Sequence, residues 1–219
     1  MEISEKELVL DAGCGNGAPT RLIAKTCGCK IIGVDVNPNQ IKKAEECNRL
    51  EGVNHLIGLS IKDIHKLDFP EESFDKIFHN ETMCHWADKT IALAGLFKTI
   101  KQGGIMGFHD WLSGDKGSLN NAGGNFPGTY AEGIWFQHTL EETNKLLQEA
   151  GFVVLHAQDT TDVVDRGLRA KLREVQMSKD YYFNSGLQEY YNKSIRYCQT
   201  MIETHYDFLK YGRFICIKN

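Results

Sequence analysis

The 219-residue sequence lacks any hydrophobic run long enough to cross a membrane. No window approaches the roughly 18 consecutive apolar residues of a transmembrane helix, and no signal-peptide core follows the amino terminus. The sequence also lacks a basic excess, because 25 lysines and arginines face 29 acidic residues and the formal net charge is −4. A nucleic-acid surface needs a basic footprint. We therefore expect a soluble, cytoplasmic protein that binds no nucleic acid.

Paired cysteines are missing as well. The seven cysteines are odd in number and scattered, and Cys27 and Cys29 have no second pair at metal-ligand spacing. Thiols that stay reduced in the cytoplasm are the simplest interpretation, with no metal site. There is no internal repeat and no low-complexity tract. A single domain over residues 1–219 is expected.

What the sequence does contain is an apolar strand that runs into glycines. Leu8 to Gly17 reads LVLDAGCGNG, in which Asp11 is followed by Gly13, Gly15 and Gly17. Glycines let a backbone turn tightly and approach a ligand where side chains would collide. Because the next segment reads as a helix, the order is strand, glycine turn, helix. This order is typical of a nucleotide cofactor site.

A second acid narrows the class of ligand that the sequence predicts. Lys30 to Val34 reads KIIGV and is followed by Asp35, at the distance of about 20 residues where an acid accepts hydrogen bonds from ribose hydroxyls. Asp11 can face an ammonium group, whereas it would repel a pyrophosphate. An adenosine-containing ligand is predicted. NAD stays open as an alternative, since the glycines also satisfy the relaxed dinucleotide fingerprint.

Alternating strands and helices predict the α/β class, with a doubly wound, mostly parallel sheet. In the first helix, Leu22 and Ile23 are expected to face the sheet, and Gly103 and Gly104 are expected to end the helix that Asp88 begins. The predicted strands cover residues 8–10, 30–34, 53–60, 75–79, 105–109, 152–156 and 214–217, and the main helices cover 18–26, 41–50, 88–102 and 140–150.

Two further helix starts are predicted from capping residues. Asn37 stands before Pro38, a side-chain cap followed by proline at the first helical position. Thr139 and Glu142 are spaced as a capping box for the helix that ends near residue 150.

Two segments break this alternation and are expected to form the substrate side. The first is a glycine-rich loop from Ser113 to His138, and the second is a helical excursion over residues 162–210 that is rich in aromatics. Loops of this length are usually functional. Aromatic residues at helical spacing are more often packed core than a binding surface, although together they can wall a pocket. The basic residues of the excursion, at 166–179, predict a solvated face.

Further blocks of the sequence carry a family resemblance. SIKDIHKLDFPEESFD, KIFHNE and IKQGGIMGFHDW, together with the glycine turn, resemble the motifs of class I S-adenosylmethionine-dependent methyltransferases. The resemblance is strong over residues 7–112 and holds only in outline beyond. It implies a Rossmann-like sheet of seven strands, with the last strand antiparallel between the fifth and the sixth. It also implies S-adenosylmethionine as cofactor and S-adenosylhomocysteine as product.

The same resemblance implies roles at the glycine turn. Asp11 and Gly13 would hold the ammonium and carboxylate of the methionine part, while Gly15 and Gly17 would shape the loop. Asp35 would bind both ribose hydroxyls. The alternative for the two acids is that they merely cap the helices that follow them.

Four more positions are implied around the adenine and the methionine. Val36 would pack on the adenine, Asp63 would accept from its amino group beside the Ile64 backbone, and Asn80 would contact the methionine part through its backbone. Asp63 has a simpler alternative, because aspartate in a polar loop is often a turn former.

The acceptor side follows strands four and five. HNETMCHWADK is similar to the branch that contains sterol, tocopherol and prenyl-diphosphate C-methyltransferases and sarcosine/dimethylglycine N-methyltransferases. In C-methylating members a glutamate matching Glu81 lies near the reacting carbon, where it could stabilise a carbocation or take a proton. For an amine acceptor it would orient the nitrogen. His85 and His109 are candidate bases, and the alternative for each is a structural hydrogen bond.

The sequence therefore predicts a methyltransferase that acts on a small-molecule acceptor at nitrogen, carbon or oxygen. An NAD-dependent oxidoreductase and a non-catalytic S-adenosylmethionine-binding module are the alternatives. Strand one begins within the first ten residues, so helices that cover the cofactor in many relatives have no room before it. Either the long loop and the excursion supply that cover, or a partner copy in a homo-oligomer does, or the site is relatively open.

Overall fold

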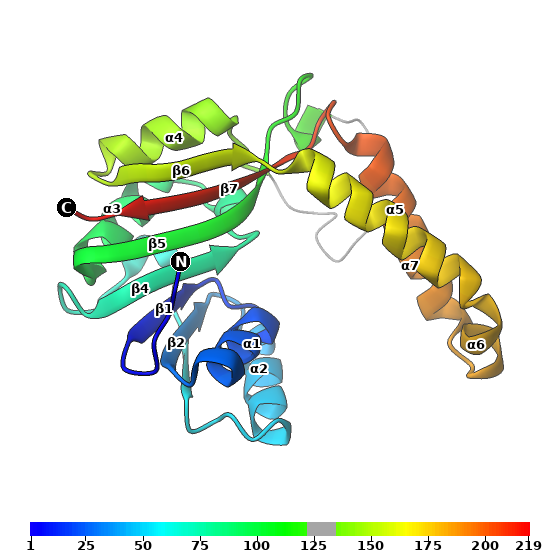
Figure 1. Ribbon diagram of the computed structural model, residues 1–219, viewed down its shortest axis with the longest axis horizontal. Coiled ribbons are helices and arrows are strands. Elements are labelled where there is room, and N and C mark those ends of the chain that lie inside the picture. Colours follow the sequence, from blue (N-terminus) through cyan, green and yellow to red (C-terminus); the bar gives the residue numbers. More distant parts are fainter. Residues whose placement is uncertain (122–134) are drawn as a thin grey trace.

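A computed structural model describes residues 1–121 and 135–219 (Figure 1). Its strands are β1 (Leu8–Ala12), β2 (Lys30–Asp35), β3 (Ile57–Ile61), β4 (Phe74–Asn80), β5 (Ile100–Leu112), β6 (Val153–Asp159) and β7 (Lys210–Ile217). Its helices are α1 (Ala18–Cys27), α2 (Pro38–Leu50), α3 (Lys89–Thr99), α4 (Leu140–Glu149), α5 (Thr161–Met177), α6 (Lys179–Asn184) and α7 (Gln188–Thr204). Three 3₁₀ helices are η1 (Ile64–Lys66), η2 (Met83–His85) and η3 (Leu119–Asn121). Part of the predicted 113–138 loop thus lies outside the described residues.

The described strands form one sheet in the order β3-β2-β1-β4-β5-β7-β6. The pairs from β3 across to β5 are all parallel. β7 is antiparallel to both β5 and β6 (Figure 1). The predicted doubly wound sheet, with the last strand inserted antiparallel between the fifth and sixth, is confirmed.

The helices begin where the sequence predicts. Asn37 accepts a hydrogen bond from the Asn39 N–H at 2.9 Å, directly before Pro38 in the first turn of α2. Asp88 accepts from the Ile91 N–H at 3.1 Å. The predicted capping box before α4 is formed, since Thr139 and Glu142 each accept a hydrogen bond from the other's backbone N–H. These caps fix the point at which each strand-to-helix connection ends.

Several predicted boundaries are wrong. β5 and β7 begin at Ile100 and Lys210, ahead of the predicted residues 105 and 214. The third strand begins at Ile57 rather than at residue 53, because Val53 to Leu56 forms a turn in which the Leu56 N–H donates to the Val53 carbonyl at 2.9 Å. The helix begun by Asp88 ends at Thr99, before the glycines that were expected to stop it. Ile100 already pairs with Phe74, and Gly103 lies in the irregular stretch of β5 that follows.

The face of α1 that meets the sheet also differs from the prediction. Leu22 is 67% exposed, whereas Ile23 packs against the apolar cluster below the helix. Thr20, Arg21 and Ala24 are the buried positions of this helix. Arg21 can be buried because its guanidinium donates to Glu51 at 2.8 Å, which satisfies the charge of the side chain.

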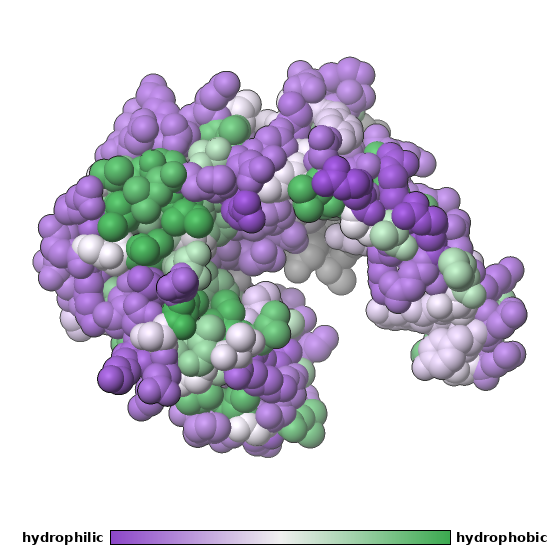
Figure 2. Space-filling model, in the orientation of Figure 1, coloured by the Kyte–Doolittle hydropathy of each residue, from purple (hydrophilic) through white to green (hydrophobic). Residues whose placement is uncertain are grey.

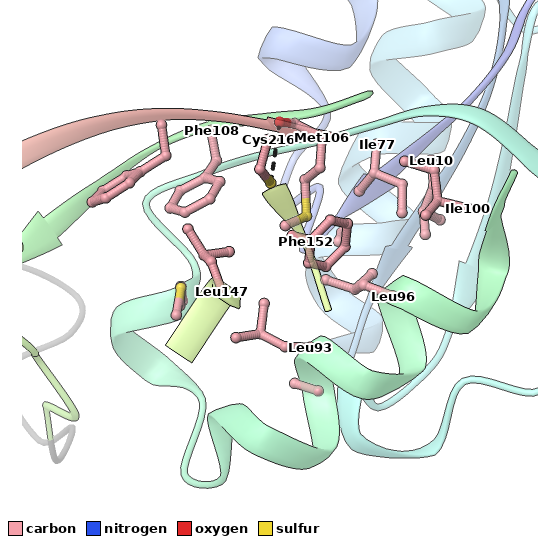
Figure 3. Close-up of a cluster of buried hydrophobic side chains, with 14 of the residues drawn as sticks. Leu10, Ile77, Leu93, Leu96, Ile100, Met106, Phe108, Leu147, Phe152 and Cys216 are labelled. Carbon is pink, nitrogen blue, oxygen red and sulfur yellow. Dashed lines mark hydrogen bonds between the residues drawn. The ribbon is translucent and has the colours of Figure 1, made fainter. Parts of the chain in front are cut away.

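Two apolar clusters pack on opposite faces of the sheet. Successive residues of a strand point to opposite faces, and Val9 and Leu10 of β1 accordingly belong to different clusters. The larger cluster joins β4 and β5 to α3 and α4 (Figure 3). Its fully buried members include Leu10, Ile77, Leu93, Leu96, Ile100, Met106, Leu147 and Cys216. Burial of each such leucine contributes roughly 1.5 to 3 kcal/mol to the stability of the fold. The strands whose carboxyl ends carry the site are therefore held by a well-packed core.

The predicted helical excursion is an arm made of α5, α6 and α7. Figure 1 shows that it projects away from the sheet, with α5 and α7 side by side. Figure 2 shows that the face of the arm in this view is mostly hydrophilic. Tyr181 and Tyr190 near its tip are mostly exposed, so they are not core residues. The basic residues of the arm are also exposed, as predicted for a solvated face: Arg166, Arg169, Lys171, Arg173 and Lys179.

Candidate functional site

The glycine turn connects β1 to α1 and is bound to β2. The N–H groups of Gly13 and Cys14 both donate to the Val34 carbonyl, at 2.8 and 2.9 Å. Gly13, Gly15 and Gly17 have φ angles of 98°, 51° and 75°, the left-handed region that favours glycine. The two hydrogen bonds therefore fix the shape of the turn, and the glycines allow its backbone to adopt that shape.

A side chain at Gly13 would also meet another segment. A Cβ atom there would lie 2.6 Å from Cγ2 of Thr82, in the loop after β4. At Gly15 no atom lies within 4 Å of such a Cβ. The turn is thus closely packed on the side of β4 and open at its tip, where a ligand has room.

Asp11 is a buried acid at the end of β1. Only 2% of its surface is exposed, and the Thr20 hydroxyl donates to Oδ2 at 2.5 Å. Burial raises the pKa of Asp11 to about 7, against the effect of the Thr20 hydrogen bond and with a smaller contribution from the negative charge of Asp35. An arriving cation would stabilise the ionised form of this carboxyl.

Asp35 ends β2 and connects the glycine turn to the start of α2. Its Oδ2 accepts from the Gly15 N–H at 2.9 Å, and its Oδ1 accepts from the Asn37 N–H at 2.8 Å. Each oxygen of a carboxylate has two lone pairs, so both oxygens can still accept from a ligand. Val36, next along the chain, is 69% exposed and lies free beside the turn.

Asp63 lies in the position predicted for it, but in a capping role. Its Oδ1 accepts from the His65 N–H at 3.0 Å and lies 2.8 Å from His65 Nδ1. These two hydrogen bonds lower the pKa of Asp63. Ile64 packs against the larger apolar cluster. The turn-former alternative is therefore realised, and a contact from Asp63 to adenine stays a prediction.

The acceptor-side residues lie at the carboxyl ends of β4 and β5. Asn80 is exposed and paired in register with His109 of β5. Glu81 follows with φ of 55°, a left-handed conformation that is uncommon without glycine, and its N–H donates to the His109 carbonyl at 2.8 Å. Burial raises the pKa of Glu81, the Trp111 side chain opposes this shift, and the charge of Asp110 adds to it.

The two histidines differ in their surroundings. His85 is exposed at one side, while its ring lies 4.8 Å from that of Trp135. The His109 ring stacks on Tyr211 at 5.7 Å, and its Nε2 lies 3.1 Å from the Thr160 hydroxyl. Partial removal from water lowers the pKa of both rings. Both rings are therefore mostly neutral at neutral pH, the form that can accept a proton.

Some residues of this site have no role in the sequence analysis. Thr82 connects the loop after β4 to the glycine turn, because its hydroxyl donates to the Ala12 carbonyl at 3.0 Å. Lys89 is buried and its Nζ donates to the carbonyls of Trp86 and Phe136. Burial lowers the pKa of Lys89 to about 8. A lysine directly after a helix cap is usually exposed to solvent, so the sequence does not predict this buried contact.

A groove of about 650 Å³ lies elsewhere, along α2 and β3. It is lined in part by Lys42, Glu46 and Arg49, and it shares no residue with the glycine turn or with the loop after β4. We assign it no part in the site. Within residues 1–121 and 135–219, no three His, Cys, Asp or Glu side chains gather as a metal site. No helix in the described part of the chain is long and apolar enough to cross a membrane.

Comparisons with known proteins agree with this geometry. The family described as a methyltransferase domain matches residues 10–108. The sterol 24-C-methyltransferase of Saccharomyces cerevisiae is 32% identical over 163 residues, which cover 73% of this chain and 43% of that protein. The chain thus spans less than half the length of this curated relative.

Solved structures share the fold at low sequence identity. Phosphoethanolamine N-methyltransferase 2 of Haemonchus contortus, in complex with phosphomonomethylethanolamine and S-adenosylhomocysteine, has a TM-score of 0.86 at 19% identity over 99% of this chain and 50% of that chain. A protein of Galdieria sulphuraria described as a sarcosine dimethylglycine methyltransferase has a TM-score of 0.79 at 20% identity, over 99% and 80%. With this strand order and a methyltransferase-domain match over residues 10–108, the chain has the fold of the class I S-adenosylmethionine-dependent methyltransferases.

Proposed function

We propose that this chain, as a single domain, binds S-adenosylmethionine at the glycine turn and transfers its methyl group to a small-molecule acceptor. The observation that carries the proposal is the pair of acids at the turn. Asp11 is buried and close to its protonation midpoint at neutral pH, and Asp35 is fixed by the N–H groups of Gly15 and Asn37. A cationic amine beside Asp11 and a ribose beside Asp35 suit these two environments.

The other cofactor contacts are proposed on the same basis. Gly13 would hold the methionine carboxylate, while Gly15 and Gly17 would shape the loop, and a ligand has room at Gly15. When bound, the cofactor supplies a sulfonium methyl that is already activated, so the protein has mainly to hold the acceptor in line and exclude water. The adenine would lie against Val36, near the backbone of Ile64. Asp63 and the backbone of Asn80 complete the proposed set.

The surroundings of Glu81 support an acceptor that carries or develops positive charge. Its carboxyl lies beside Trp111, and Trp111 stacks on Trp135 at 4.9 Å between ring centroids. Aromatic rings and a carboxylate together stabilise a cation, whether an amine or a carbocation formed on methyl transfer. A sterol 24-C-methyltransferase, a phosphoethanolamine N-methyltransferase and a sarcosine dimethylglycine methyltransferase are among the proteins compared above. We propose that Glu81 contacts the reacting centre, with His85 and His109 as the proton acceptors beside it.

The first experiment tests cofactor and acceptor together. Calorimetry should show binding of S-adenosylhomocysteine and no binding of NAD. Release of S-adenosylhomocysteine should then be followed with S-adenosylmethionine and a panel of a sterol, phosphomonomethylethanolamine and sarcosine, chosen from the compared proteins. Turnover with one class names the acceptor. NAD binding alone would support an oxidoreductase, and cofactor binding without turnover on any acceptor would support a binding module.

The second experiment tests the catalytic residues on the acceptor so found. Glu81→Ala and His85→Ala should each lower kcat by about 10²-fold, the scale of lost acid-base participation. Affinity for S-adenosylhomocysteine should change little, because Asp11 and Asp35 serve the cofactor. His156→Ala, an exposed histidine on β6, is the matched control. Full turnover in both variants would leave positioning and exclusion of water as the whole mechanism.

We also propose the cytoplasm as the compartment, since all seven cysteine thiols are free. A homo-oligomer is a further proposal, because the arm projects from the sheet and a partner copy could lie against it (Figure 1). Cell fractionation and light scattering of the purified protein test these two statements.

A further inference from the structure

The carboxylate of Asp110 accepts hydrogen bonds from the backbone of the loop that carries Glu81. Asp110 lies near the carboxyl end of β5 and is 2% exposed. Its Oδ2 accepts from the N–H groups of Thr82 at 2.9 Å and Met83 at 2.7 Å. Its Oδ1 accepts from the N–H groups of Cys84 at 3.1 Å and Trp111 at 2.8 Å. Four donors on two oxygens use all the acceptor capacity of the group.

This loop needs such an anchor for two physical reasons. Glu81 has a left-handed backbone without being glycine, which costs on the order of 1 kcal/mol and persists only where the surroundings impose it. The N–H groups of Met83 and Cys84 also begin η2, where no earlier turn supplies them with carbonyl partners. A neutral side chain could satisfy only part of this set. The buried carboxylate satisfies all of it.

The surroundings keep Asp110 ionised. Burial alone would raise its pKa, but the neighbouring His79 ring and the backbone N–H groups lower the pKa below the ordinary value. Nδ1 of His79 lies 3.4 Å from Oδ2 of Asp110. The His79 ring is held between those of Phe108, at 4.2 Å, and Trp86, at 5.0 Å. The acceptor of the four hydrogen bonds is thus an anion in a fixed place.

The same loop is bound to the glycine turn. The Thr82 hydroxyl donates to the Ala12 carbonyl at 3.0 Å, and its Cγ2 lies against Gly13. We propose that Asp110 is a positioning residue for methyl transfer, which holds the 81–84 loop against the glycine turn and thereby sets where Glu81 stands relative to the cofactor. This inference rests on the proposed function, in which Glu81 contacts the reacting centre.

Asp110→Asn tests the proposal with S-adenosylhomocysteine as the only added ligand. The carboxamide keeps one acceptor oxygen and turns an NH₂ group toward donors, so amide exchange at Thr82 and Met83 should accelerate by about tenfold or more. The pKa of Glu81, followed by carboxyl-carbon NMR and assigned with Glu81→Gln, should fall because the neighbouring charge is lost. The Kd for S-adenosylhomocysteine should stay within about threefold, and kcat on the identified acceptor should fall far more than the cofactor KM changes.

The matched control is Asp88→Asn, which removes the same charge from an exposed cap in the same connection. It should leave exchange at Thr82 and the Glu81 pKa unchanged. If Asp110→Asn also leaves both unchanged, the inference is wrong. If that variant does not fold, the wild type decides, because the Thr82 and Met83 amides should exchange more slowly than the exposed Thr90 amide in the first turn of α3. Equal exchange would overturn the inference, whereas failure of the wild type to bind S-adenosylhomocysteine would instead overturn the proposed function.

Discussion

Two aspartates flank one glycine turn, yet they are held in different ways. Asp11 has a single hydrogen bond from Thr20 and almost no contact with water, whereas Asp35 is half-buried and accepts from two backbone N–H groups. The sequence predicts both positions, because an acid after each of two buried strands is a local pattern. It does not predict the depth of burial, which depends on the packing of α1, whose Thr20 hydroxyl donates to Asp11.

Cofactor affinity should depend on pH through Asp11. Its pKa of about 7 in the free protein means that binding a cationic amine requires loss of a proton over the neutral range. Affinity for S-adenosylhomocysteine should therefore rise by about tenfold from pH 6 to pH 8, as measured by calorimetry. Asp11→Asn should bind weakly with a flat profile. A wild-type affinity that does not change over this range would contradict the prediction.

The same shift acts on the stability of the free protein with the opposite sign. A carboxyl whose pKa is raised on folding stabilises the folded state fully below its ordinary pKa near 3.8, and this contribution is lost as pH rises through about 7. Relative to Asp11→Asn, the free wild type should therefore lose melting temperature as pH increases over that window. Equal pH dependence in the two proteins would show that Asp11 is not a buried titrating group.

Asp35→Ala should weaken binding of S-adenosylhomocysteine by roughly 1.5 to 3 kcal/mol, the scale of hydrogen bonds to a charged acceptor. Because Asp35 also accepts from Asn37 at the start of α2, Asn37→Ala is the control for a loosened helix start. That control should lower stability and leave the affinity nearly unchanged. Unchanged affinity in Asp35→Ala would make Asp35 a structural residue only.

At the scale of elements, turn chemistry and caps are the most predictable features. Thr139 with Glu142, Asp88 and Asn37 all cap helices at the predicted places, because these interactions span only a few residues. The start of β3 is not predictable in the same way. Val53 and Leu56 are apolar because they pack into a core cluster from a turn, which imitates the alternation of a strand.

The contact between the glycine turn and Thr82 gives a prediction at this scale. Gly13→Ala should destabilise the protein by about 1 to 3 kcal/mol, because the new Cβ would meet Thr82 Cγ2 and φ is 98°. Thr82→Ser removes Cγ2 and keeps the hydroxyl. Adding it to Gly13→Ala should restore part of the loss in urea unfolding. Strictly additive effects of the two changes would show that the two segments do not touch.

At the scale of the molecule, the arm is the least predictable part. Its helices follow from periodicity, but its direction depends on a buried polar contact that spans distant parts of the sequence. His205 Nδ1 lies 3.2 Å from Asp165, and His205 Nε2 lies 3.3 Å from the Tyr211 hydroxyl of β7. All three are buried where the arm meets the sheet. An isolated sequence shows three polar residues there, without the geometry that joins them.

His205→Ala should lower the free energy of unfolding by about 1 to 3 kcal/mol, because it leaves Asp165 and Tyr211 without their buried partner. Amide exchange in α5 and α7 should accelerate more than in α4. Tyr206→Phe is the matched control, since it removes one exposed hydrogen bond, at 2.6 Å to Asp162, from the same place. Uniform acceleration through the whole sheet would show that this contact does not hold the arm in particular.

The place of β7 in the sheet has a consequence for the order of synthesis. β6 pairs only with β7 among the described strands, and Phe214 and Cys216 of β7 are fully buried in the larger apolar cluster. A ribosome delivers residues 153–159 before residues 210–217, so β6 has no strand to pair with while the arm is being made. The amino-terminal strands can assemble during translation. The stack of the His109 ring on the Tyr211 ring, beside the proposed acceptor site, can therefore form only after β7 has left the exit tunnel.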